Sequence, residues 1–155
     1  MSFVFSGTGG CLCGAIRYEC HGVPYAAALC HCRNCQKAHA AAFAPLLFVP
    51  PETVTFVKGR VSRHEMVAES GAKMFRDFCR ECGSPLFSGG AAFPRLISVK
   101  MVNLDAPGAV SPIAHIWAES RVSWGCVSDG LPVFRKQPPL DELVKLWVEK
   151  YRGMA

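Results

Sequence analysis

The amino-acid sequence predicts a mainly β fold with antiparallel sheets and one C-terminal helix. Glycine and proline recur throughout the 155 residues and divide the chain into short segments. Several segments are rich in β-branched and aromatic residues or alternate between apolar and polar residues. Both patterns are typical of short strands in antiparallel sheets. Only the end of the chain has the apolar periodicity of a long helix. We expect one domain spanning residues 1–155.

Seven segments carry the strand signal. They are Ala15–Cys20, Ala42–Val49, Val54–Val57, Arg63–Val67, Met74–Cys79, Leu96–Met101 and Ala114–Trp117. The stretch Arg33–Ala41 is compatible with one or two helical turns.

The long helix is predicted at about residues 140–152. Pro138 and Pro139 precede it, acidic residues occupy its first turn, and Gly153 ends it. Its apolar face is formed by Leu140, Leu143, Val144, Leu146, Trp147 and Tyr151. We expect this face to belong to the core or to a homodimer contact.

Composition excludes several classes of protein. Half of the residues are apolar and 19% are charged, which indicates a globular chain. The net charge of +5 is spread without a basic run, so nucleic-acid binding is not expected. The longest apolar run, Ala40–Val49, is too short to cross a membrane. Residues 1–7 lack the basic flank and apolar core of a secretory signal, so we expect a cytoplasmic location and no membrane partner.

Most of the nine cysteines fall into three compact clusters. These are Cys11–Cys13, Cys30–Cys35 and Cys79–Cys82. An odd number of cysteines in a reducing compartment favours metal ligands over disulfides. Residues i and i+2 of an extended segment point to one side of the chain, so a C-x-C pair can share one ion. A C-x-x-C pair does so by forming a tight turn around the ion. Gly14 and Gly83 follow two of the clusters and allow such turns to finish. The sequence therefore predicts zinc binding.

The spacing allows seven cysteines to be divided between two zinc ions in two ways. In the first, one ion is bound by Cys30, Cys32 and Cys35, and the other by Cys11, Cys13, Cys79 and Cys82. In the second, Cys11 and Cys13 join Cys30 and Cys32, which leaves Cys35, Cys79 and Cys82. We favour the first, because a closed set of four is typical of a structural site, and three ligands with an open position are typical of a reactive one.

The remaining cysteines and three histidines give weaker signals. Cys20 and Cys126 are each interpreted as a buried small hydrophobe. His31 and His39 lie in or near the middle cluster and are candidates for a fourth ligand or a proton carrier. His115 is expected to be structural.

The clusters and their neighbours resemble the glutathione-dependent formaldehyde-activating enzyme (GFA) family. The motifs that carry the resemblance are Gly9–Tyr18, Cys30–Lys37, Phe78–Phe87, Ala114–Trp117 and Asp129–Pro132. The match runs from about residue 9 to residue 139. It implies an Mss4-like (β-tent) fold. It also implies the first division, with a structural zinc at Cys11, Cys13, Cys79 and Cys82 and a catalytic zinc at Cys30, Cys32 and Cys35.

The resemblance further implies carbon–sulfur lyase chemistry on an adduct such as S-hydroxymethylglutathione, with a small thiol such as glutathione as partner. Three thiolates leave zinc with one net negative charge, which makes it a weak activator of water but still able to bind and deprotonate a thiol. We hypothesise that such a thiol adds to a small aldehyde and that a nearby histidine, such as His31, or a water moves the proton.

A non-catalytic zinc-stabilised binding module is the alternative. A fourth protein ligand at the second zinc, from His31, His39 or Cys126, would favour it. In either case we expect two zinc ions per chain. Without a fourth protein ligand, the second ion is expected to be bound less tightly and its site to be partly occupied.

Overall fold

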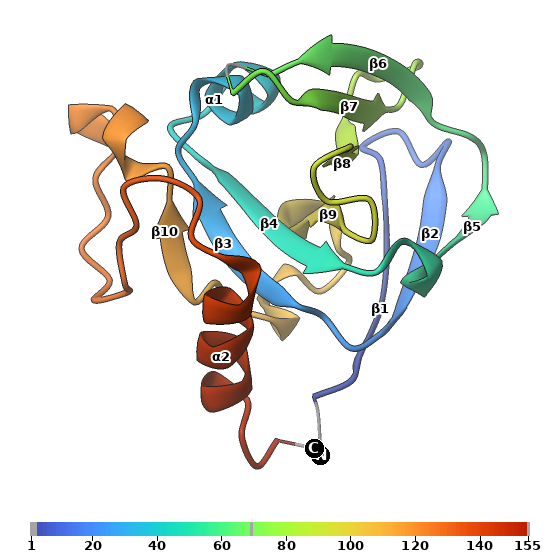
Figure 1. Cartoon of the computed structure of the whole chain (residues 1–155). Coiled ribbons are helices and arrows are strands. Elements are labelled where there is room, and N and C mark those ends of the chain that lie inside the picture. The colour runs from blue at the N-terminus through green and yellow to red at the C-terminus, as the bar shows by residue number, and fades with distance from the viewer. Residues whose placement is uncertain (1–2, 69, 155) are drawn as a thin grey trace.

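The computed structural model describes residues 3–68 and 70–154 (Figure 1). Met1 and Ser2, at the start of the N-terminal segment considered above, lie outside the described residues. The strands are β1 (Phe5–Gly10), β2 (Arg17–Gly22), β3 (Ala26–Cys30), β4 (Ala44–Val49), β5 (Val54–Lys58), β6 (Ser62–Val67), β7 (Lys73–Phe78), β8 (Pro85–Gly90), β9 (Ile97–Lys100) and β10 (Ala114–Ile116). The α-helices are α1 (Arg33–His39) and α2 (Leu140–Lys150), and the short 3-10 helices are η1 (Pro51–Thr53), η2 (Met101–Asn103), η3 (Pro107–Ala109), η4 (Ala118–Ser120) and η5 (Ser123–Gly125).

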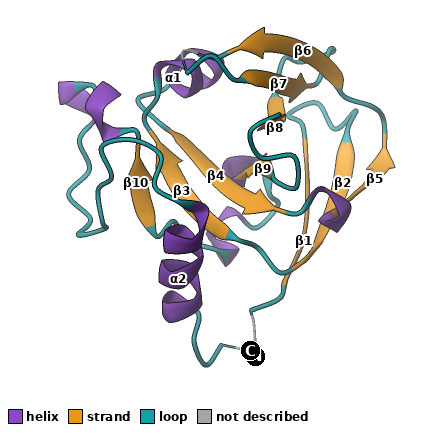
Figure 2. Cartoon of the chain, in the orientation of Figure 1, coloured by secondary structure: helices purple, strands orange, loops and turns teal. Residues whose placement is uncertain are grey.

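The predicted mainly β fold is confirmed, and Figure 2 shows strands dominating the described chain. All seven expected strands are present with small shifts at their ends, whereas β1, β3 and β8 were not predicted. The strands form a three-stranded sheet in the order β1-β2-β5 and a seven-stranded sheet in the order β10-β3-β4-β9-β8-β7-β6. All pairs are antiparallel except β10 with β3, which makes the larger sheet mixed at that edge. A long connection rather than a hairpin precedes β10, and this allows the parallel pairing.

The smaller sheet packs against the β8 region of the larger one (Figure 1). Tyr18 is fully buried, and its ring centroid is 4.9 Å from that of Phe87. Phe56 meets Phe87 from the neighbouring strand, with ring centroids 5.6 Å apart. A Cβ atom at Gly9 would lie 2.5 Å from the hydroxyl oxygen of Tyr18, so only glycine fits beside this ring. This packing brings the turn after β1 toward the turn after β7.

Helix α2 covers β3, and its apolar face lies in the core. Leu143 and Trp147 are 0% and 2% exposed. Phe3 stacks on Tyr151 with ring centroids 4.4 Å apart, and the hydroxyl of Tyr151 accepts a hydrogen bond of 2.9 Å from the backbone N–H of Ser111. Of the two interpretations of this face, the core is therefore the one that the structure supports.

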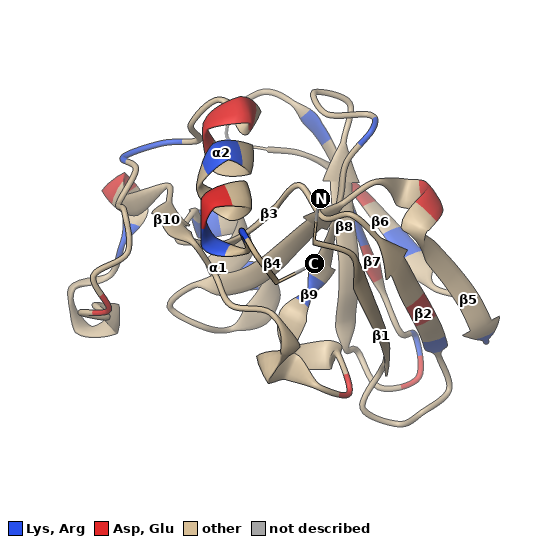
Figure 3. Cartoon of the chain, turned by 90° about the horizontal axis from the view of Figure 1, so that it is seen from below, with Lys and Arg blue, Asp and Glu red and all other residues tan. Residues whose placement is uncertain are grey.

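Charged residues are mixed in sign along α2, as Figure 3 shows. Lys145 and Asp141, one helical turn apart, approach to 3.7 Å on its exposed side. Among the described residues, no helix combines the length and the apolar character that crossing a bilayer would require.

Candidate metal centres

The first group of cysteines joins two turns that are far apart in the sequence. Cys11 and Cys13 lie between β1 and β2, and Cys79 and Cys82 lie between β7 and β8. Their four sulfur atoms all lie within 4.8 Å of one another. The Sγ atoms of Cys11 and Cys13 are 3.6 Å apart, and those of Cys13 and Cys79 are 3.9 Å apart. This four-cysteine group could hold a metal ion, since ligand sulfurs around tetrahedral zinc are about 3.8 Å apart.

A glycine completes each of the two turns. Gly14 has φ 74° and Gly83 has φ 75°, both in the left-handed region. The N–H of Gly14 donates to the carbonyl of Cys11 (3.1 Å), and the N–H of Gly83 donates to the carbonyl of Cys79 (2.8 Å). A side chain would strain this backbone, so the glycines have the role predicted for them.

Ser84 links the same two turns through its hydroxyl group. Its Oγ accepts a hydrogen bond of 3.0 Å from the N–H of Leu12 and lies 3.2 Å from the Sγ of Cys82. The hydrogen bond from Ser84 is the main reason that the pKa of Cys82 is lowered to about 6. A lowered pKa favours the thiolate, which is the form that binds metal. Sequence reasoning gave Ser84 no role, and its only signal is its position directly after Cys82-Gly83.

The second group, the three-cysteine group, forms where β3 meets α1. Cys30 ends β3, Cys32 is the N-cap of α1, and Cys35 lies in the first turn of that helix. The Sγ of Cys32 accepts a hydrogen bond of 3.3 Å from the N–H of Cys35. All three sulfur atoms lie within 4.8 Å of one another, so this group could also hold a metal ion. The structure thus groups the seven cysteines as in the first of the two divisions that the spacing allowed.

Two cations from the large sheet lie beside the three-cysteine group. Both terminal nitrogens of Arg76, on β7, are 4.0 Å from the Sγ of Cys35. Lys100, at the end of β9, is 1% exposed. The thiols of Cys30 and Cys32 hydrogen-bond to Cys35 and, with the charges of Arg76 and Lys100, lower the pKa of Cys35 to about 2. Burial lowers the pKa of Lys100 to about 8, against the opposing effect of Cys35. Sequence reasoning did not identify either cation, because both come from strands distant from the cluster.

His39, at the end of α1, contacts the three-cysteine group through the backbone of Cys35. Its Nδ1 is 2.8 Å from the carbonyl oxygen of Cys35. Because a carbonyl only accepts, Nδ1 carries the proton and Nε2 has a lone pair. This Nε2 is buried and has no hydrogen-bond partner within the described part of the chain. Burial, with a contribution from Lys100, lowers the pKa of His39 and favours the neutral ring.

His31 belongs to a buried chain of hydrogen bonds. Its Nε2 is 2.8 Å from Nδ1 of His115, whose Nε2 is 3.0 Å from both carboxylate oxygens of Asp129. The carboxylate must accept, so His115 donates through Nε2 and accepts from His31 through Nδ1. Burial, followed by the charge of Arg121, lowers the pKa of His31 to about 4. Neither His31 nor His39 contributes an atom to the three-cysteine group.

Gln36 fixes the start of α1 beside this chain. Its side-chain amide donates to the carbonyl of His31 at 2.7 Å and to the carbonyl of Ser120 at 2.9 Å. The helix that carries Cys35 is therefore attached both to β3 and to the segment after β10. Gln36 stood in a family motif, but nothing in its spacing indicated this role.

The two other cysteines lie outside both groups. Cys20 is buried on β2, as predicted, with its Sγ 3.9 Å from Oγ1 of Thr53. The prediction that Cys126 is buried is wrong, because Cys126 is exposed directly after η5. The general tendency of free cysteine to be buried does not apply in this segment, where Trp124 is also 79% exposed.

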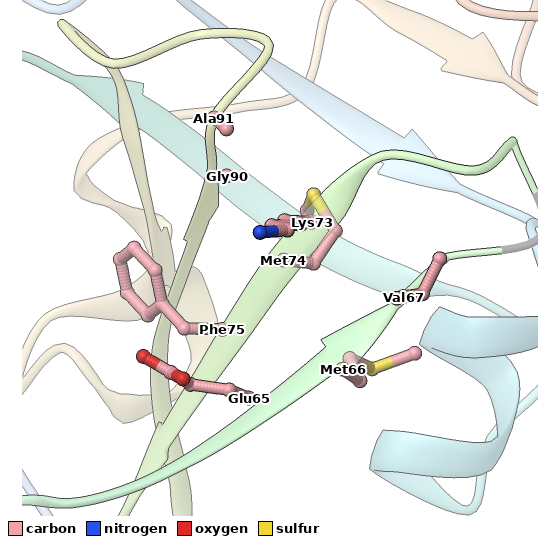
Figure 4. Close-up of a pocket in the computed structure, with 8 residues that line it drawn as sticks. All are labelled: Glu65, Met66, Val67, Lys73, Met74, Phe75, Gly90 and Ala91. Atoms are coloured by element: carbon pink, nitrogen blue, oxygen red, sulfur yellow. The ribbon is translucent and has the colours of Figure 1, made fainter.

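One pocket lies over the β6–β7 hairpin, with a volume of about 740 Å³. Glu65 and Phe75, which are paired across the two strands, lie side by side in it (Figure 4). A smaller hollow of about 230 Å³ lies along α1 and is lined by Arg33, Lys37 and Trp124 among others. No cysteine of either group lines these hollows.

The fold and the two cysteine groups define a class: a mainly β protein with two cysteine groups that could hold metal ions. The sequence model of the glutathione-dependent formaldehyde-activating enzyme family matches residues 6–120, which is more than half of the chain. The chain therefore belongs to this family, as its motifs predicted, and its fold agrees with the Mss4-like fold.

One solved structure similar to the chain is the crystal structure of a Rhodobacter sphaeroides protein determined as a structural-genomics target. The two are 20% identical with a TM-score of 0.51, and the match covers 68% of this chain and 91% of the other. At this identity the likeness shows the fold alone. No curated protein matches the chain by sequence.

Proposed function

We propose that the protein is a zinc-dependent carbon–sulfur lyase that makes or breaks an adduct of a small thiol and an aldehyde, with S-hydroxymethylglutathione as the model substrate. The observation that carries the proposal is the contrast between the two groups, one of four cysteine sulfurs and one of three. Four ligands complete a tetrahedral zinc, whereas three leave a position for an outside ligand. The family to which the chain belongs agrees with a thiol in that position.

Zinc fits both groups by the chemistry of their donors. Each offers only thiolate ligands, which a borderline-soft ion such as zinc accepts. The sulfur spacings of 3.6 and 3.9 Å in the four-cysteine group agree with tetrahedral zinc. We assign a structural zinc to Cys11, Cys13, Cys79 and Cys82, and a catalytic zinc to Cys30, Cys32 and Cys35. A zinc ion bound there would lower the pKa of a thiol placed beside it.

The surrounding residues have roles that this chemistry requires. Cys30 and Cys35 are buried and Cys32 is half-buried, so Cys32 is the most accessible of the three ligands. The Nε2 of His39, which has no hydrogen-bond partner among the described residues, is the candidate acceptor for the proton of an incoming thiol. The same role remains a prediction for His31, whose Nε2 is already bonded to His115.

The test is an assay of aldehyde and thiol consumption with glutathione and formaldehyde, run in both directions. Cys32→Ser should keep the fold and one zinc per chain but lose most of the activity. Cys126→Ser, at an exposed cysteine outside both groups, is the matched control and should behave as the parent protein. If Cys32→Ser retained full activity, the proposal would be wrong.

A measurement of zinc content separates the proposal from a non-catalytic binding module. Protein purified under reducing conditions should contain two zinc ions per chain, and glutathione should change the spectrum of cobalt substituted at the three-cysteine group. One tightly held zinc and no response to glutathione would favour the binding module.

A further inference from the structure

One cation, Arg76, contacts the three-cysteine group, and a second, Lys100, lies on the same sheet face; neither has a carboxylate partner among the described residues. Arg76 directs both terminal nitrogens toward the Sγ of Cys35 at 4.0 Å, and Lys100 is almost completely buried. On the same strand pair as Arg76, Arg63 instead forms an ion pair of 2.7 Å with Asp77. Across residues 3–68 and 70–154, neither Arg76 nor Lys100 forms an ion pair with an aspartate or glutamate.

The strand register places both cations on one face of the large sheet. Arg76 is directly opposite Ser88 on β8, and Ser88 is directly opposite Ser98 on β9. Residues in such a row project to the same face, and Lys100, two residues after Ser98, shares that face. The Nζ of Lys100 donates to the Oγ of Ser88 at 2.6 Å, and that oxygen is 2.9 Å from the Oγ of Ser98. Two neutral hydroxyl groups therefore fix the position of a buried ammonium group.

A cation out of contact with water and without a counter-ion is unfavourable, so the buried Lys100 beside the half-buried Arg76 indicates an anion at their side. Three thiolates and a divalent ion carry one net negative charge, and a thiolate as fourth ligand raises it to two. Arg76 and Lys100 together match that charge. At the four-cysteine group Cys13 is exposed, so water can solvate the same charge there.

We propose that Arg76 and Lys100 are counter-charges that make the three-cysteine centre prefer an anionic fourth ligand, a thiolate, over a neutral one such as imidazole. The proposal rests on the proposed function only in requiring a metal ion at this group and an outside ligand. In this role the charges of the two residues determine which outside ligand the metal ion prefers. They are not themselves ligands of the metal.

The test compares two outside ligands on the same cobalt-substituted protein. Binding of 2-mercaptoethanol, which has a thiol and no carboxylate, and of imidazole is followed by the change in the visible absorption of cobalt. The variants are Arg76→Met, Lys100→Met and Lys100→Gln, the last of which retains a donor for Ser88 without the charge. Lys73→Met is the control, because it removes one positive charge at an exposed position on the strand that carries Arg76.

Each loss of charge at Arg76 or Lys100 should weaken the binding of 2-mercaptoethanol by at least about tenfold, while imidazole binding changes by less than about twofold. Lys73→Met should change neither. A general disturbance of the structure would weaken both ligands together, so the ratio of the two affinities is the decisive quantity. Near-ultraviolet circular dichroism identifies any variant that fails to fold. If Lys100→Met does not fold, Lys100→Gln is used in its place.

Two results would overturn the inference. One is an unchanged ratio in all three variants, which would leave the proposed function intact if the parent protein still binds thiols and is active. The other is a parent centre that binds neither ligand, which would remove the proposed function as well. A third result is possible: the variants change the ratio of thiol to imidazole affinity, but the parent protein is inactive on aldehyde adducts. This result would support the inference and count against the proposed substrate.

Discussion

At the scale of single residues, Ser84 shows how one hydroxyl group can organise a metal site without being a ligand. It accepts from Leu12 in one turn and contacts Cys82 in the other, so it holds the turns together independently of an ion. The cysteines themselves could be predicted from the sequence because their spacing reflects ligand geometry. The contribution of Ser84 could not, since it depends on two turns that only the fold brings together.

We predict that Ser84→Ala lowers the free energy of unfolding by about 1–2 kcal/mol, because two hydrogen bonds are lost and one backbone N–H loses its partner. Urea unfolding of the metal-loaded protein measures this effect. Ser128→Ala, at an exposed serine, is the control and should change the stability by less than about 0.5 kcal/mol. Equal effects of the two substitutions would contradict the role given to Ser84.

Asp105 is the second single residue for which we make a prediction, and the prediction concerns its pKa. Hydrogen bonds from Arg17, and then from Thr8, lower its pKa from 3.8 to about 2. Because the folded pKa lies below the ordinary value, this interaction stabilises the fold above about pH 4 and is lost as the pH falls toward 2. Titration of the carboxyl carbon by NMR should give a midpoint near 2, and Arg17→Met should return it toward 3.8. A normal midpoint in the parent protein would contradict the contact.

At the scale of secondary-structure elements, the strands that sequence reasoning missed share a composition. β1 and β8 end in pairs of glycines, and β3 reads Ala-Ala-Ala-Leu-Cys. Neither glycine nor alanine favours a strand by itself. These strands form because their neighbours approach closely, as at Gly9 beside Tyr18, and that proximity is a property of the whole fold. The terminal helix was predictable because its periodicity is local.

Helix α2 leads to a quantitative prediction. Leu143 is 0% exposed against β3, so Leu143→Ala should lower the free energy of unfolding by about 2–5 kcal/mol through lost burial and a cavity. Val148→Ala on the same helix, at a side chain that is 50% exposed, should have an effect below about 1 kcal/mol. Chemical denaturation followed by circular dichroism compares the two. Similar losses would mean that the helix is only loosely attached to the sheet.

At the scale of the whole molecule, the four-cysteine group connects the two sheets. Cys11 and Cys13 follow a strand of the small sheet, and Cys79 and Cys82 follow a strand of the large one. The three-cysteine group, by contrast, spans one strand end and the helix that follows it. An ion at the first group would hold distant parts of the chain together, and an ion at the second would hold only neighbouring residues.

We therefore predict that a chelator removes metal in two stages. The three-cysteine group should lose its ion first, with little change in near-ultraviolet circular dichroism. Loss of the second ion should coincide with the loss of tertiary structure, because binding at such a group contributes directly to folding. Cys79→Ser should abolish the second stage and lower the melting temperature far more than Cys32→Ser. Simultaneous release of both ions without unfolding would contradict this order.

The connection between the sheets also has a consequence for the protein during its synthesis. Cys11 and Cys13 emerge from the ribosome well before Cys79 and Cys82, at a delay of roughly several seconds for ordinary rates of translation. During that interval the other cysteines made are Cys20 and then the middle cluster, and of these only the middle cluster offers several closely spaced thiolates. The nascent chain can thus trap an ion in the other division of cysteines that the spacing allows, and correct assembly requires that ion to be exchanged once the later turn has been made.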